Sequence, residues 1–171
     1  MSMRHLVRRF AGSLWPGGPT AAGEDWAQAR LLPGEQDLWR RMSGPDRRHA
    51  ITVAHRVERA LGHEATRPVL AAAMLHDVGK VASGLGTFAR VGATIVGLGG
   101  GRSQARDMQR RRGLTRRVGL YLRHGEIGAD MLAVAGSDPL TVAWTREHHR
   151  PPGEWTVDRH AAEALKAADD D

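Results

Sequence analysis

The stretch PVLAAAMLHDVGK, residues 68–80, decides the fold of this chain. Residues 69–75 are apolar on every side of a helix, which predicts a central helix packed all round. The apolar run ends in His76 and Asp77, two side chains that are costly to bury unless they are paired. Gly79 follows, where we expect the chain to turn. The inner end of the most buried helix therefore needs partners that offset this cost.

The sequence on both sides is also predicted to be helical. Apolar residues recur every three or four positions, and the alternation typical of strands is almost absent. With the Pro and Gly signals at their ends, the expected helices span residues 24–32, 35–42, 45–61, 68–76, 85–98, 114–122, 124–132, 139–149 and 159–169. We expect an all-α helical bundle forming one domain over residues 24–171, preceded by an arm and linker at residues 1–23.

The composition excludes several classes of protein. The 171 residues include no Cys, so a disulfide framework and thiolate metal sites are excluded, and any transition metal must be held by His, Asp or Glu. No apolar run is long enough for a transmembrane segment, and residues 1–10 lack the features of a secretory signal. A cytoplasmic location is the expectation.

Positive charge is concentrated in one segment. The chain carries +6, and residues 102–123 contain eight Arg against a single acid, Asp107. Nucleic-acid binding is one interpretation of such a segment. A solvated helix face is favoured, because no aromatic stacking platforms are interleaved with these arginines.

Five histidines and two aspartates lie at predicted helix ends or on apolar stripes, where groups from several helices of a bundle can converge. They are His49, His76, Asp77, His124, His148, His149 and Asp169. His55 is an alternative to His49, but it lies off the apolar stripe of its helix. Seven imidazoles and carboxylates suit two divalent first-row ions, Fe or Mn foremost and Zn, Ni or Co as alternatives, with one carboxylate bridging them.

These residues resemble the pattern of the HD superfamily of metal-dependent phosphohydrolases, an all-α helical fold. The motif carriers are Arg48-His49-Ala50, the doublet His76-Asp77, and Asp169 in Ala-Ala-Asp. His124, in His-Gly-Glu-Ile-Gly-Ala, and the pair His148-His149 resemble the longer pattern of HDIG-type and cyclic-dinucleotide-cleaving members. The resemblance covers roughly residues 45–171.

The resemblance implies how the site is built. One ion would be held by His49, His76, Asp77 and Asp169, and the other by Asp77, His124, His148 and His149. Asp77 would bridge the ions. Lys80 matches a Lys that often follows the doublet and would hold a phosphate oxygen in catalysis, although a Lys that caps the helix C-terminus is an equal alternative. Arg146 and Arg150 bracket the histidine pair and are candidates for binding phosphate, with a rim salt bridge as the alternative.

We therefore expect a metal-dependent phosphohydrolase acting on a nucleotide, a cyclic nucleotide or a related small phosphorylated substrate. The histidine pair is followed by Arg150-Pro151-Pro152 instead of the Gly-Tyr-Pro signature of one subgroup, so the cyclic dinucleotide of guanine is not the expected substrate. Two alternatives remain open. One is an HD-type diiron oxygenase, and the other is a non-catalytic, metal-containing module that senses a ligand or binds nucleic acid.

Overall fold

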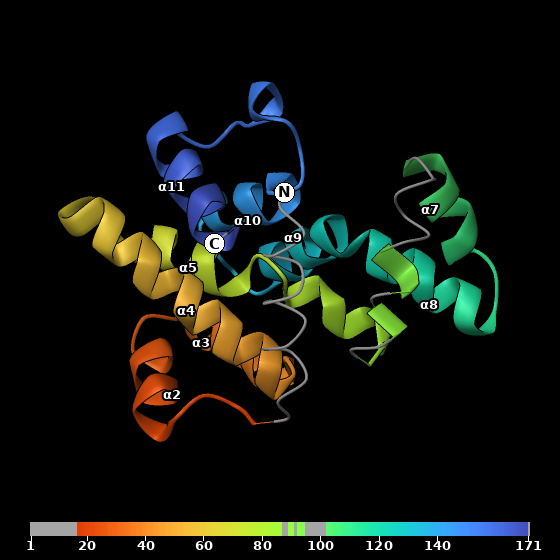
Figure 1. Ribbon diagram of the computed structural model, residues 1–171, viewed down its shortest axis with the longest axis horizontal. Helices are drawn as coiled ribbons and strands as arrows, with labels where there is room; N and C mark the ends of the chain where they lie inside the picture. The colour runs from red at the N-terminus through yellow and green to blue at the C-terminus, as the bar shows by residue number, and fades with distance from the viewer. Residues whose placement is uncertain (1–16, 87–88, 91, 95–101, 171) are drawn as a thin grey trace.

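The chain folds into helices joined by turns and short loops in the part that a computed structural model describes, residues 17–86, 89–90, 92–94 and 102–170 (Figure 1). Residues 89–90 and 92–94 are helical. The labelled elements are α2 (Ala21–Gln28), α3 (Pro33–Arg41), α4 (Gly44–Leu61), η1 (Gly62–Glu64), α5 (Arg67–Leu75), η2 (Val78–Ser83), α7 (Arg102–Gln109), α8 (Gly113–Leu122), α9 (His124–Val134), α10 (Pro139–Glu147), η3 (Pro152–Glu154) and α11 (Arg159–Asp170). The described residues contain no strand, which confirms the all-α prediction.

Helix α5 is the centre of the fold. All of its residues from Val69 to Leu75 are buried. Helices α4 and α10 pack against it, and α11 packs against α4. Met74, Trp144 and Leu165 are among the fully buried side chains that fill the space between these helices. The predicted central helix is therefore confirmed, and its C-terminal end lies inside the molecule.

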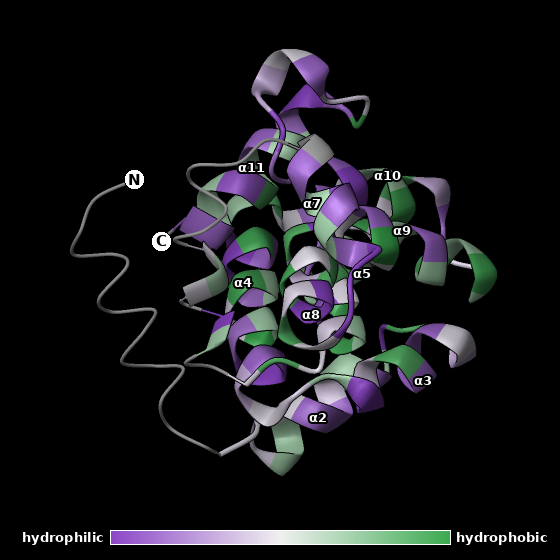
Figure 2. Cartoon of the chain, turned by 90° about the vertical axis from the view of Figure 1, so that its right-hand side faces the viewer, coloured by the Kyte–Doolittle hydropathy of each residue, from purple (hydrophilic) through white to green (hydrophobic). Residues whose placement is uncertain are grey.

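Local signals set the ends of α4 and α10. The Ser43 hydroxyl accepts a hydrogen bond from the backbone of Asp46 at the start of α4, and the Asp138 carboxylate does the same for Leu140 at the start of α10. Gly62, with φ of 54°, ends α4 as predicted. Between its ends α4 is amphipathic, and hydrophilic residues border its hydrophobic stripe (Figure 2).

The N-terminal boundary differs from the prediction. Helix α2 begins at Ala21, inside the expected linker of residues 1–23, because the Thr20 hydroxyl accepts a hydrogen bond from the Gly23 backbone. Residues 1–16 of the expected arm and linker lie outside the described residues. So does much of the helix expected at residues 85–98.

Gly79 is needed for close packing rather than for a left-handed backbone conformation. The chain continues after α5 into η2, and φ is positive at Gly84 rather than at Gly79. A Cβ on Gly79 would lie 2.0 Å from the His124 carbonyl oxygen and 2.6 Å from the Gly128 nitrogen. Glycine is required here because η2 packs on α9 almost backbone to backbone, which draws Asp77 and α9 together.

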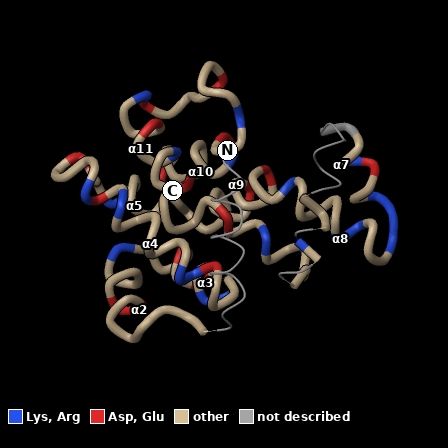
Figure 3. The backbone as a smooth tube through the Cα atoms, viewed as in Figure 1, with Lys and Arg blue, Asp and Glu red and all other residues tan. Residues whose placement is uncertain are grey.

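The Arg-rich segment forms a helical hairpin of α7 and α8 at one end of the long axis of the molecule (Figures 1 and 3). Helix α8 packs on η2, and α7 packs on α8. The hairpin is thereby joined to the element that follows Asp77. None of the helices in the described ranges combines the length and the apolar character that a membrane crossing requires.

Candidate metal centre

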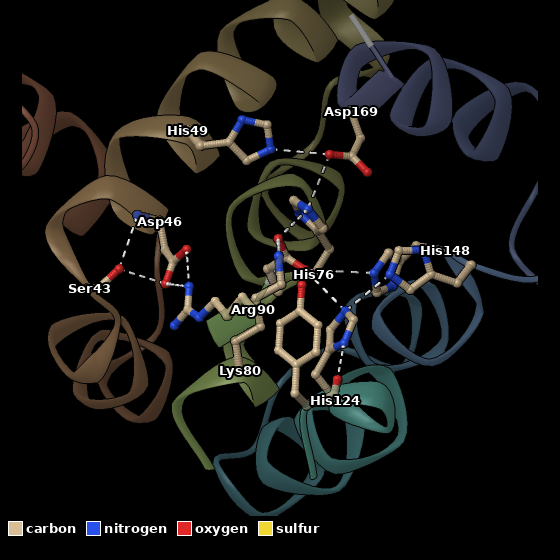
Figure 4. Close-up of polar contacts among 12 residues, drawn as sticks. Ser43, Asp46, His49, His76, Lys80, Arg90, His124, His148 and Asp169 are labelled. Atoms are coloured by element: carbon tan, nitrogen blue, oxygen red, sulfur yellow. Dashed lines mark hydrogen bonds and ion pairs between the residues drawn. The ribbon is translucent and has the colours of Figure 1, made fainter. Parts of the chain in front are cut away.

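The fold brings the seven predicted ligand residues into one cluster (Figure 4). Most of them sit at the ends of helices, where a side chain can reach past the packed helix faces. His76 caps the C-terminus of α5 and Asp77 precedes η2. His124 is the first residue of α9, and His148 caps the C-terminus of α10. The other three come from α4, from the residue after His148, and from the last turn of α11.

One group of ligand atoms lies between α4, α5 and α11. One ligand atom from each of His49, His76 and Asp77 lies within 4.8 Å of the other two. Asp169 closes this group from α11, because its Oδ1 lies 3.1 Å from His49 Nε2 and 3.5 Å from His76 Nε2. Asp169 does not belong to this group of three. Its carboxylate lies close to the two imidazoles rather than to Asp77.

A second group lies between η2, α9 and α10. One ligand atom from each of Asp77, His124, His148 and His149 lies within 4.8 Å of the other three. The Nε2 atoms of His124 and His149 are 3.1 Å apart. Two imidazole nitrogens this close together could both bind the same metal ion.

Asp77 belongs to both groups through different oxygens. Its Oδ2 lies 3.4 Å from His76 Nε2. Its Oδ1 lies 3.2 Å from His124 Nε2 and 3.8 Å from His148 Nε2. A carboxylate with one oxygen toward each group has the orientation that a bridge between two metal ions requires.

Backbone carbonyls orient three of the histidine rings. In each case Nδ1 donates to a carbonyl three residues earlier in the chain, an interaction typical of metal-binding histidines because it directs Nε2 to the ligand position. The pairs are His76 with Ala73 (3.0 Å), His124 with Tyr121 (2.7 Å) and His148 with Thr145 (2.9 Å). The Nε2 atoms of His76 and His148 are buried and have no hydrogen-bond partner among the described residues. Buried ring nitrogens that accept or donate no hydrogen bond are suited to binding a metal ion.

The carboxylates govern the charge on His76. Burial alone would lower the pKa of His76, but the charges of Asp77 and Asp169 outweigh it and raise the pKa to about 10. Burial alone would raise the pKa of Asp77, but Lys80 and His76 hold it well below its usual range. A proton on His76 thus neutralises part of the acidic charge, and a metal ion that binds this nitrogen must displace it.

The histidine pair of α10 has the opposite tendency. Burial and the neighbouring imidazoles, His149 first, lower the pKa of His148 well below its usual value. Part of His149 faces solvent, yet desolvation of its ring and the nearby His124 lower its pKa to about 3. Both rings are neutral at pH 7, which is the protonation state that a metal ligand needs.

Lys80 lies at the edge of the cluster. Its ammonium forms an ion pair with Asp77 Oδ2, and its side chain is only 16% exposed. Burial alone would lower the pKa of Lys80, but Asp77, Tyr121 and Asp46 raise it. Lys80 therefore places a permanent positive charge beside the shared carboxylate, instead of only capping a helix from the surface.

Within the described residues, the hydrogen bonds and ion pairs of the two predicted phosphate-binding arginines do not involve the seven clustered residues. Arg146 forms an ion pair with Asp130 at 2.9 Å, and both side chains are exposed, which is the rim salt bridge that the sequence left as the alternative. No described residue forms a hydrogen bond or ion pair with the Arg150 guanidinium, although its carbonyl accepts a hydrogen bond from Trp155. Their contact with phosphate stays a prediction.

Sequence reasoning missed Glu147, the residue before the histidine pair. Glu147 is buried, and its carboxylate accepts hydrogen bonds from the backbone and the hydroxyl of Thr156, both at 2.7 Å. These bonds hold residues 150–156 against the end of α10. No local signal predicts them, because Thr156 lies nine positions along the chain, beyond a loop.

Sequence reasoning also missed an ion pair beside Lys80. Arg90 Nη1 donates to both Asp46 oxygens at 2.8 Å, and Ser43 donates to Asp46 Oδ2 at 2.6 Å (Figure 4). Asp46 lies three residues before His49 in the first turn of α4. Its acidic charge at a helix N-terminus was visible in the sequence, but its partner 44 residues away was not.

Comparison with known proteins adds no relative. No protein-family model matches the chain, and no curated protein or solved structure matches it either. What the chain shows by itself is an all-α fold with buried His and Asp groups that could hold metal.

Proposed function

We propose that this protein is a metal-dependent phosphohydrolase of the HD superfamily, which uses water to cleave a phosphoester of a nucleotide, a cyclic nucleotide or a related small molecule. One observation carries the proposal: the oxygens of Asp77 face two separate groups of imidazoles. When bound, two divalent ions acidify a water molecule and neutralise charge that develops at phosphorus.

The ligand set divides at Asp77. One ion would be held by His49, His76, Asp77 and Asp169, and the other by Asp77, His124, His148 and His149. Fe or Mn is the first choice for this set of imidazoles and carboxylates, with Zn, Ni and Co also compatible.

The remaining residues orient the reacting groups. The carbonyls behind His76, His124 and His148 keep Nε2 of each ring directed into the site. The Lys80 ammonium, which pairs with Asp77, would donate a hydrogen bond to a non-bridging phosphate oxygen. Its proton remains on Nζ throughout, because the raised pKa disfavours its loss.

Hydrolysis of bis(p-nitrophenyl) phosphate and of nucleotides by the Mn- or Fe-loaded protein tests the proposal. We expect metal-dependent release of the product alcohol, and we expect His76→Ala and Asp77→Ala each to abolish it. Asp130→Ala and His55→Ala are matched controls, because both residues lie outside the cluster and should leave the rate unchanged. Activity that survives both cluster variants would falsify the assignment.

Elemental analysis of protein purified without added metal is an independent test. We expect about two ions per chain, as two-metal sites require, and a value near zero would count against the cluster as a metal centre. Oxygen consumption with a polyol or a phosphonate would instead support the diiron oxygenase. The inclusion of both His148 and His149 in one group favours the hydrolase, because the oxygenase pattern uses six ligands.

A further inference from the structure

The tip of the α7–α8 hairpin, residues 110–116, carries positive charge that no acidic side chain of the described residues neutralises. Arg110, Arg111 and Arg112 follow one another through the connection, and Arg116 lies in the first turns of α8. All four are exposed, and none of their guanidinium groups forms an ion pair within the described part of the chain. Figure 3 shows these basic residues along the hairpin at one end of the molecule.

Several other arginines of the described chain have acidic partners. Arg90 pairs with Asp46, and Arg123 pairs with Glu126. At the tip, by contrast, like charges lie next to one another with water as their neighbour, so an anionic surface would relieve their mutual repulsion. The hairpin is therefore the surface of the described chain where the positive charge is most available to a partner.

An exposed leucine sits among these charges. Leu114 is 64% exposed and is one of two large hydrophobic side chains that lie exposed within the described ranges. The phosphates of a nucleic-acid backbone make no apolar contact with an aliphatic side chain. The interfacial layer of a lipid bilayer can bury such a side chain while the neighbouring arginines contact the headgroups. The one aromatic residue of α8, Tyr121, lies near Lys80 at the other end of this helix, so the tip has no stacking platform for bases.

We propose that the tip of this hairpin, residues 110–116, docks the protein on an anionic lipid surface. Arg110, Arg111, Arg112 and Arg116 contact headgroup phosphates, and Leu114 enters the interfacial layer. Because α8 packs on η2, docking would hold the cluster in a fixed orientation relative to the lipid surface. This role is independent of the hydrolytic activity.

Sedimentation with vesicles tests the proposal on the full chain. We expect binding to vesicles of phosphatidylcholine and phosphatidylserine in equal amounts, little binding to phosphatidylcholine alone, and loss of binding as salt is raised. Each arginine near the surface contributes about fivefold in affinity. The double variant Arg111→Glu and Arg112→Glu should therefore weaken binding by at least about 25-fold.

The matched control is Arg40→Glu with Arg41→Glu, which changes the net charge equally on exposed residues of α3. It should retain most of the binding. Leu114→Ser should weaken binding several-fold without changing net charge. Circular dichroism and metal content should match the wild type for all variants, because every changed side chain is exposed.

Three outcomes would overturn the proposal. The first is no binding to the anionic vesicles at low salt. The second is an equal loss in the α3 control, or no loss in Leu114→Ser, since either would reduce the effect to net charge. The third is tighter binding to duplex or single-stranded nucleic acid than to vesicles at the same salt, which would assign the hairpin to nucleic acid.

Discussion

Asp77 is the side chain on which both halves of the cluster depend. Its two oxygens face different imidazole groups, and Lys80 also pairs with it. The other six predicted ligands each contribute to one half. Asp77 is buried, so a neutral side chain of the same shape fits the space but removes the charge that the neighbouring groups share.

Asp77→Asn should weaken binding of both ions. We expect the affinity for Mn or Zn to fall at least about tenfold at each site, since even residues that only orient ligands are worth about 10–100-fold. Isothermal titration calorimetry measures both affinities. Asp130→Asn changes an exposed carboxylate outside the cluster and should bind metal as the wild type does. A variant that keeps one site at full affinity would show that Asp77 does not bridge.

The histidines make the stability of the metal-free protein depend on pH. The pKa of His76, about 10 in the folded protein, lies above its unfolded value. The protonated His76 therefore contributes to the stability of the folded protein. This stabilisation is complete below about pH 6.5 and is lost as the pH rises toward 10. The pKa of His149 is lowered to about 3, so stability is also lost as the pH falls from about 6.5 toward 3.

Urea unfolding in the presence of a chelator should therefore show maximal stability near about pH 6.5. On the alkaline side we expect a decline of a few kcal/mol by pH 9, on the order of what the shift of a fully buried group implies. His76→Gln should remove most of this decline, whereas His55→Gln, on the exposed side of α4, should keep it. A flat alkaline limb in the wild type would contradict the charge assigned to His76.

At the scale of elements, the contact of η2 with α9 positions the shared carboxylate. This contact needs a glycine at position 79, because the atoms that a Cβ would meet belong to the backbone of α9. Backbone atoms cannot rotate away as a flexible side chain can. The two elements must then separate, and His124 moves with α9.

Gly79→Ala should destabilise the protein and weaken metal binding together. We expect a loss of about 1–3 kcal/mol in the free energy of unfolding, as for other overpacked positions, measured by urea unfolding with chelator. Gly153→Ala is the control, because a Cβ there meets nothing within 4 Å. Normal metal affinity in Gly79→Ala would mean that the η2 contact does not set the Asp77 to His124 geometry.

Glu147 fixes the loop that follows α10. Replacing it by Ala leaves the Thr156 amide and hydroxyl without their acceptor, so we expect a loss of about 1–3 kcal/mol in the free energy of unfolding. Glu163→Ala, which removes an exposed pair with Arg159, should change it by less than about 1 kcal/mol. Urea unfolding measures both variants. Equal losses in the free energy of unfolding would contradict the role assigned to Glu147.

At the scale of the whole molecule, the cluster draws its residues from α4, α11 and the ends of α5, α9 and α10. Two metal ions bound there would together join five helices, which span residues 44–170. Ligands that bind only the folded state stabilise it by mass action. The centre should therefore act on global stability and not only on local order.

Thermal unfolding with and without added Mn measures this effect. At a hundredfold excess over the dissociation constant we expect about 2.7 kcal/mol of added stability for each site. His148→Ala with His149→Ala should lose the contribution of one site, and His63→Ala, on an exposed turn, should lose none. The prediction fails if the double variant gains as much stability from Mn as the wild type.

Much of the fold follows from local patterns. The apolar run of residues 69–75, the caps Ser43 and Asp138, and Gly62 predict where helices begin, end and become buried. Helix periodicity and capping involve residues three or four positions apart, so they can be seen in the chain itself. The same patterns also select the seven ligand candidates, because polar groups at the ends of buried helices stand out.

Long-range packing decided the rest. The two-sided orientation of Asp77 depends on η2 lying against α9, which requires Gly79. The pairing of Arg146 with Asp130 depends on how α9 and α10 pack together. Residue types and spacing therefore determined that this chain is all-helical and which side chains are available as ligands. Only the tertiary structure decided which of them meet and through which atoms, because those contacts join residues that no local periodicity relates.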